Sequence, residues 1–145
     1  MNKVRRPARQ PVRPAVMFEL LHAARQLEEQ LESALATADL SMAKYRVLAQ
    51  LAAYGKPMSL GQLAARHKCV RSNMTQLVDR LESDGLVRRV GDPEDRRSVR
   101  AELTPLGRTR QVAGAGAVER VQVEFSAALP ARDRLALERA LAALR

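Results

Sequence analysis

Aromatic side chains are almost absent from this sequence, and their scarcity narrows the range of possible folds. Of its 145 residues only 3% are aromatic, with no Trp, two Phe and two Tyr. β-Sandwiches depend on aromatic and β-branched residues, whereas a core built from Leu, Val, Ala and Met favours helices. The length is that of one domain, and an apolar share of 46% is enough for a core.

Cysteine and histidine are also too rare for a disulfide or a metal centre. Cys69 is the single cysteine, which excludes an intramolecular disulfide. His22 and His67 are the two histidines, and no second pair completes a tetrahedral zinc set with His67 and Cys69. The sequence contains neither a Gly-rich phosphate loop nor a nucleophile motif. We therefore expect no metal, no cofactor and no enzymatic activity.

Negative charge is scarce as well. The chain has 25 Lys and Arg against 16 Asp and Glu, which gives a formal net charge of +9 and a pI near 10.9. Such a pI points first to nucleic acid and second to an acidic membrane surface. A charge that only aids solubility is the plain alternative. No apolar run reaches the roughly 18 residues of a membrane span, so we expect no membrane partner and a cytoplasmic location.

The first fifteen residues differ in composition from the rest. Residues 1–15 contain three prolines, no acid and five cations, which are Lys3, Arg5, Arg6, Arg9 and Arg13. Such a segment cannot bury enough apolar surface to order itself, so we expect a flexible basic arm. This arm either contacts the DNA backbone or remains a solvated tail. Residues 16–145 contain no long linker and are expected to form a single domain.

Beyond the arm, apolar residues recur at the spacing of helices, then of a hairpin, then of helices again. Helical spacing covers 16–38, 41–55, 59–66, 71–84, 105–128 and the chain from 130 onward. The apolar period changes to two in 86–90 and 98–103, on either side of turn formers at 91–95. Ser59 and Gln62 form a capping box, and Thr104 followed by Pro105 is typical of a helix start.

This order of elements predicts a winged helix-turn-helix, a mainly α fold with a small β-hairpin wing, over 41–104. The helix at 71–84 would enter the major groove of double-stranded DNA and read base edges with its polar side chains. The candidate residues on its open face are Arg71, Ser72, Asn73, Thr75, Gln76 and Arg80. An ordinary solvated face is the alternative, because Asp79, Glu82 and Asp84 would repel phosphate. These acids lie in the second half of the helix, away from the groove.

The tip of the hairpin carries Asp95, Arg96 and Arg97. A narrow minor groove attracts inserted Arg side chains, and an Asp beside them can hold the Arg stem in place. We therefore expect all three residues at the DNA. A solvated turn is the alternative.

The stretches 77–89, 92–98 and 103–108 resemble the signature of the multiple-antibiotic-resistance regulator (MarR) family. The resemblance implies a homodimeric bacterial or archaeal transcription factor, usually a repressor. It also implies that helices 16–38 and 105–145 form the dimer interface and that Arg97 enters the minor groove. Small phenolic or other aromatic effectors often bind family members between the dimer and DNA-binding regions. His22, Tyr45 and Arg46 lie on helices that flank this cavity and are candidate ligand residues. Each has a structural alternative. His22 can be a surface or interface residue, Tyr45 a core residue, and Arg46 a solvated charge.

Two positions depart from the family pattern. Val70 stands where the residue that caps the DNA-reading helix is usually Ser or Thr, so Ser72 is a candidate cap that would start the helix later. Cys69 stands in the turn before that helix, where the family usually has an apolar residue. We expect it to fill space as a small buried hydrophobe, with redox sensing as the alternative.

Taken together, these features predict a sequence-specific regulator that binds a pseudo-palindromic operator. A sequence-independent architectural DNA-binding protein is the main alternative.

Overall fold

The computed structural model describes residues 15–95 and 97–144. The six helices of these residues are α1 (Ala15–Ala36), α2 (Met42–Tyr54), α3 (Leu60–Arg66), α4 (Arg71–Ser83), α5 (Pro105–Ala127) and α6 (Ala131–Ala142). Their three strands are β1 (Met58–Ser59), β2 (Val87–Gly91) and β3 (Val99–Leu103). The predicted basic arm lies outside the described residues except for Ala15, which begins α1. Each predicted helix and both hairpin strands are present, with ends that differ by at most two residues, except that α6 stops at Ala142 instead of continuing along the chain.

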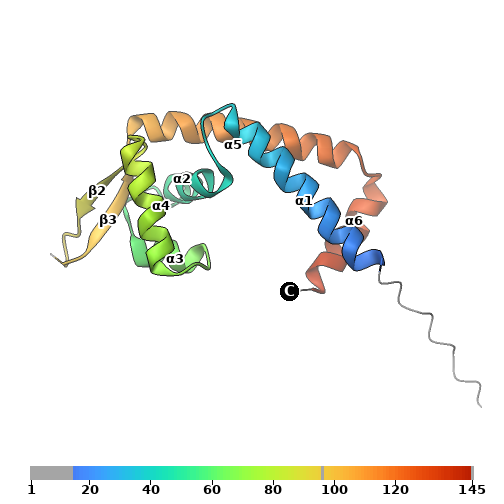
Figure 1. Ribbon diagram of the computed structural model, residues 1–145, viewed down its shortest axis with the longest axis horizontal. Helices are drawn as coiled ribbons and strands as arrows, with labels where there is room; N and C mark the ends of the chain where they lie inside the picture. The colour runs from blue at the N-terminus through green and yellow to red at the C-terminus, as the bar shows by residue number, and fades with distance from the viewer. Residues whose placement is uncertain (1–14, 96, 145) are drawn as a thin grey trace, which may run out of the picture.

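The elements are arranged along the long helix α5 (Figure 1). At one end of it lie α2, α3, α4 and the strands, packed together, with the hairpin projecting outward. At the other end lie the first half of α1 and the short α6. The fold therefore separates a compact lobe from an extended pair of terminal helices. Within the described residues, no helix is both long enough and apolar enough to cross a bilayer.

The capping residues predicted from the sequence begin their helices as expected. The Ser59 hydroxyl accepts a hydrogen bond from the Gln62 backbone N–H at 3.2 Å, and the Gln62 side chain accepts one from the Ser59 N–H at 3.0 Å. The Thr104 hydroxyl accepts from the Gly107 N–H at 2.9 Å, with Pro105 in the first turn of α5. Each satisfies a backbone donor that the helix itself leaves unpaired.

The hairpin is part of a three-stranded antiparallel sheet in the order β1-β3-β2. In the hairpin, Val87 pairs with Leu103 and Gly91 with Val99. Strand β1, in which Met58 pairs with Ala101, was not predicted from the sequence. A two-residue strand has no measurable period, so it leaves no signal there. Because Met58 is fully buried, β1 fixes the base of the hairpin to the core.

The core fills the compact lobe and is built almost entirely from aliphatic side chains and Met, as the composition predicts. Its largest fully buried members are Leu35, Leu48, Met58, Leu63, Met74, Leu81, Val47, Val78 and Val87. They come from α1, α2, β1, α3, α4 and β2, so the core joins α4 to the base of the hairpin.

The terminal helices are apolar but largely unburied in the single chain. Leu35 is the one buried residue of α1, and α6 has none. The exposed large apolar side chains of α1 and α6 are Val16, Met17, Phe18, Leu20, Leu21, Leu135 and Leu141, and Leu144 beyond α6 is exposed too. Helix α1 is therefore buried in the core of its own chain only at Leu35.

Candidate nucleic-acid interface

Helix α4 has one buried face and one polar face. Met74, Val78 and Leu81 are buried beneath it. Arg71, Ser72, Asn73, Gln76 and Arg80 are all exposed on the remaining surface, as expected from the sequence. Thr75 is the exception among the candidates, because it is half-buried and its hydroxyl donates to the Arg71 carbonyl at 2.9 Å. The side chain of Thr75 is thus engaged with its own helix.

The helix begins at Arg71, and Val70 is its N-cap without a side-chain hydrogen bond. The expectation that Ser72 caps a later start is therefore wrong. The backbone explains why, because the Val70 carbonyl accepts the N–H groups of both Asn73 and Met74. This start places Arg71, Ser72 and Asn73 in the first turn, where residues of a DNA-reading helix contact base edges.

The acids in the second half of α4 are compensated by basic side chains. Asp79 lies 2.5 Å from the Arg89 guanidinium, and Glu82 pairs with the same group. Asp84, just after the helix, lies 2.5 Å from the Lys44 ammonium group. The hydrogen bond to Asp79, followed by those of Glu82, holds the pKa of Arg89 above its usual value against the opposing effect of desolvation. The three acids were singled out from the sequence, but their partners Arg89 and Lys44 were not.

The tip of the hairpin is organised by two aspartates. The Asp92 carboxylate pairs with Arg100 at 2.8 Å and accepts the Glu94 N–H at 3.0 Å. These contacts, led by the hydrogen bond from Arg100, hold the pKa of Asp92 below its usual value. The Asp95 carboxylate accepts the backbone N–H of Arg97 at 2.9 Å. Asp95 thus orders the backbone that carries Arg97, rather than the Arg97 stem as expected from the sequence.

Arg97 is exposed at this tip, whereas Arg96 lies outside the described residues. The hairpin and α4 lie at the same end of the molecule, opposite the terminal helices (Figure 1). The exposed polar face of α4 and the exposed Arg97 therefore belong to one end of the fold. This is the arrangement that the winged helix-turn-helix prediction requires.

The three candidate ligand residues do not gather in one place. His22 is exposed on α1, and Arg46 is exposed on α2. Tyr45 is half-buried against the core and packs beside Gly114 of α5, where a Cβ would come within 2.7 Å of the Tyr45 ring. In the single chain, Tyr45 therefore packs as a core residue and His22 lies at the surface.

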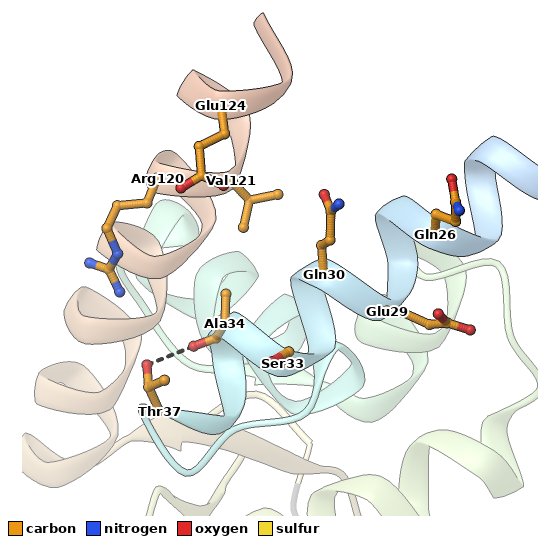
Figure 2. Close-up of a pocket in the computed structure, with 9 residues that line it drawn as sticks. All are labelled: Gln26, Glu29, Gln30, Ser33, Ala34, Thr37, Arg120, Val121 and Glu124. Atoms are coloured by element: carbon orange, nitrogen blue, oxygen red, sulfur yellow. Dashed lines mark hydrogen bonds between the residues drawn. The ribbon is translucent and has the colours of Figure 1, made fainter. Parts of the chain in front are cut away.

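A cavity of about 700 Å³ lies instead between α1 and α5. Figure 2 shows side chains of both helices around it. Its lining residues are Gln26, Glu29, Gln30, Ser33, Ala34, Thr37, Arg120, Val121 and Glu124. His22 is one helical turn before Gln26, so it is the candidate nearest in sequence to this lining. The polar lining was not identified from the sequence, because no short motif marks it.

His67 and Cys69 occupy the turn between α3 and α4. Cys69 is half-buried and packs against the core, in line with a space-filling role. The Nε2 atom of His67 is buried without a hydrogen-bond partner among the described residues. Desolvation, and secondarily the charge of Arg46, lower the pKa of His67 from its ordinary 6.5. From the sequence, His67 was considered only as a metal ligand, and its burial was missed.

The lowered pKa predicts a specific dependence of stability on pH. The folded state binds fewer protons at His67 than the unfolded state does, so protonation favours unfolding. His67 leaves the free energy of unfolding unchanged above pH 6.5 and reduces it as the pH falls from 6.5 through the folded pKa.

Urea denaturation from about pH 7.5 to about pH 5 measures this loss. In His67→Gln the loss should be smaller than in the parent and in His22→Gln, which removes an exposed histidine. Identical pH profiles in all three proteins would contradict the prediction.

Comparison with known proteins identifies the lobe that carries these residues. The sequence model of the MarR family matches residues 40–99, from just before α2 to the first residue of β3. A 50-residue segment is 44% identical to the uncharacterized HTH-type transcriptional regulator YsmB of Bacillus subtilis (strain 168). That alignment covers 34% of this chain and 34% of YsmB, so the chain aligns with about a third of its relative's length.

Solved structures match over nearly the whole chain. The transcriptional repressor CouR bound to a 23-mer DNA duplex is 28% identical, with a TM-score of 0.79 over 89% of this chain and 91% of CouR. CouR from Rhodococcus jostii RHA1 bound to p-coumaroyl-CoA gives a TM-score of 0.76 at 24% identity, over 94% and 95% of the two chains. A mutant MarR from E. coli complexed with operator DNA shares the fold, with a TM-score of 0.79 at 24% identity over 89% and 93%.

Regulators of the MarR family are DNA-binding proteins without enzymatic activity. The missing phosphate loop and nucleophile motif led to the same expectation for this chain. The matched segment contains α4, β2 and the hairpin tip, which carry the residues of the candidate interface. Residues 40–99 of this chain thus match the MarR family, and the fold around them is that of winged helix-turn-helix regulators of this family.

Proposed function

We propose that this protein is a transcriptional regulator that binds a pseudo-palindromic operator as a homodimer and represses transcription. The observation that carries the proposal is the pairing of two exposed elements at one end of the fold. One is the polar face of α4 with Asn73 and Gln76, and the other is the hairpin tip with Arg97. Amide side chains match adenine edges in the major groove, and an Arg suits the minor groove beside it. The net charge of +9 supports binding to phosphate.

In this proposal Arg71, Ser72, Asn73, Gln76 and Arg80 face the major groove. Thr75 contributes less than expected, since its hydroxyl is engaged within α4. Arg96 and Arg97 are both proposed to reach the minor groove, and Asp95 shapes the turn that presents Arg97. A regulator of this kind acts where the chromosome lies, so we place it in the cytoplasm. Selection of duplexes from a random library tests the proposal, and enriched sequences should carry two inverted half-sites about 10 bp apart. Enrichment of no sequence would instead favour an architectural DNA-binding protein.

The unburied apolar residues of the terminal helices support the homodimer. Phe18 on α1 is 62% exposed and α6 buries no residue, so these helices need a partner to cover them. A symmetric dimer through α1, α5 and α6 would do so and would present two α4 helices to a palindrome.

Sedimentation equilibrium at micromolar concentration should therefore give twice the chain mass of 16.1 kDa. Phe18→Glu should shift the protein toward monomer, because it places a charge in the buried interface. Val70→Glu, at a residue equally exposed but in the turn before α4, should stay dimeric. A monomeric parent would contradict both the dimer and the palindrome.

We further propose that a small aromatic or phenolic effector regulates DNA binding. CouR, bound to p-coumaroyl-CoA in one of its structures, supports this class of effector. The cavity between α1 and α5 is the favoured place, because α5 connects the terminal helices to the compact lobe. Arg120 lines this cavity, and His22 lies one helical turn before the lining residue Gln26, so both are proposed ligand residues. Tyr45 and Arg46 remain proposals on α2.

A further inference from the structure

One residue of the hairpin contacts α4 in three ways. Arg89 lies in β2 and is half-buried. Its guanidinium lies 2.5 Å from Asp79 and pairs with Glu82 through its other terminal nitrogen. Its backbone N–H donates to the second oxygen of Glu82 at 3.1 Å. Asp79 and Glu82 are three residues apart and hence on one face of α4, so a single Arg of the wing binds two carboxylates of the DNA-reading helix.

The other ion pairs of the hairpin have a different location. Arg88 pairs with Glu102 across β2 and β3, and Arg100 pairs with Asp92 near the tip. Both pairs stay within the hairpin and stiffen it internally. Within residues 15–95 and 97–144, the ion pairs that join the hairpin to α4 are those of Arg89. A planar guanidinium can bridge two carboxylates in a fixed orientation, which a flexible ammonium group cannot.

We propose that Arg89 is a positioning residue that sets the spacing between α4 and the wing for simultaneous contact with the major and minor grooves. This inference rests on the proposed function. Two elements held at the right spacing before binding lose less conformational freedom when both grooves are contacted. Binding to random DNA does not require both elements to contact defined positions at once. Arg89 should therefore strengthen binding to the operator more than binding to random DNA. Arg89 itself is engaged with carboxylates and is not assigned a phosphate contact.

The alternative is that Arg89 only cancels the charge of Asp79 and Glu82 near the DNA. A charge-matched variant separates the two roles. Arg89→Ala removes one positive charge, whereas Asp79→Asn combined with Arg89→Ala keeps the net charge of the parent and still removes the bridge. Asp79→Asn combined with Glu82→Gln breaks the bridge from the helix side and removes two negative charges. Arg88→Ala is the matched control, because Arg88 is the neighbouring residue of β2 and pairs only within the hairpin.

The first measurement is independent of DNA. Spin labels on Ser72→Cys in α4 and Glu94→Cys in the wing, in a Cys69→Ala background, report the distance between the two elements by pulsed electron resonance. The parent and Arg88→Ala should give one narrow distribution, and the three bridge-breaking variants should give broad ones. A narrow distribution of unchanged mean in the bridge-breaking variants would overturn the proposal.

The second measurement is titration of the selected operator and of random duplex at several salt concentrations. The charge-matched variant should lose about tenfold in preference for the operator while keeping the salt dependence of the parent. The helix-side variant, Asp79→Asn with Glu82→Gln, should bind random DNA more tightly yet show the same loss of preference. If the charge-matched and helix-side variants both kept the parent's preference for the operator, Arg89 would act by charge compensation alone. A parent that binds all duplexes equally would contradict the proposed function, and the spin-label distances would still decide whether Arg89 holds the wing.

Discussion

Replacing Gly107 with Ala should destabilise the protein by more than about 3 kcal/mol. Gly107 lies in the first turn of α5, where a Cβ would stand 1.8 Å from the backbone oxygen of Leu86 and 2.8 Å from its carbonyl carbon. Both atoms belong to the backbone, so no side chain can rotate away. Moving α5 outward would break the Thr104 hydroxyl bond to the Gly85 carbonyl, 2.6 Å, and the Thr104 N–H bond to Leu86. The clash therefore disturbs the junction of α4, the wing and α5.

Urea denaturation of Gly107→Ala measures the effect, with Gly116→Ala as the matched control. Gly116 lies on the same helix, and the nearest heavy atom to its Cβ would be a terminal nitrogen of Arg120 at 3.8 Å. Because Ala is favoured over Gly within a helix, Gly116→Ala should gain about 0.5–1 kcal/mol if nothing else changes. Equal stabilities of Gly107→Ala and the parent would show that α5 does not approach the wing this closely in solution.

The second large effect concerns the two elements proposed to contact DNA, which should respond differently to mutation. Gln76→Ala should narrow the free-energy gap between operator and random DNA by about 1–3 kcal/mol, because the amide of Gln76 matches a base edge. Arg97→Ala should weaken binding to many sequences. It should also reduce the salt slope by about 0.9 for each phosphate that Arg97 neutralises, because its guanidinium displaces condensed counterions.

Titrations on operator, on operator with exchanged A·T-rich flanks and on random duplex distinguish these outcomes. The flank exchange is needed because an Arg in a narrow minor groove also favours A·T-rich sequence. Arg132→Ala is the control, since Arg132 is highly exposed on α6 at the other end of the chain. If Arg97→Ala bound all three duplexes with the affinity and salt slope of the parent, the hairpin would not be a DNA-contacting wing.

Much of the fold could be predicted from the sequence because its signals are local. Ser59 and Thr104 act within a few residues of themselves, and their predicted roles at helix starts are confirmed. Helical periodicity likewise predicted the buried face of α4. Strand β1 could not be predicted, since Met58 and Ser59 are too short a segment to show a period.

The parts of the site that were missed depend on contacts between distant residues. Arg89 looks like any other cation of a basic hairpin until Asp79 and Glu82 are seen beside it. His67 looked like half of a metal pair, and only packing reveals that its Nε2 is buried. Helical spacing predicted the start of α4 at residue 71 correctly, and only the alternative cap at Ser72 was wrong. The backbone forms the first turn after Val70 without a side-chain cap.

The central claim is that this chain recognises a particular DNA sequence. Its most direct test is competition between the operator selected from the random library and random duplex of the same length and base composition, at a fixed salt concentration near 0.15 M. We expect the parent to prefer the operator by about 10³-fold or more. Equal affinity for the two duplexes would contradict the claim and identify the protein as a sequence-independent DNA-binding protein.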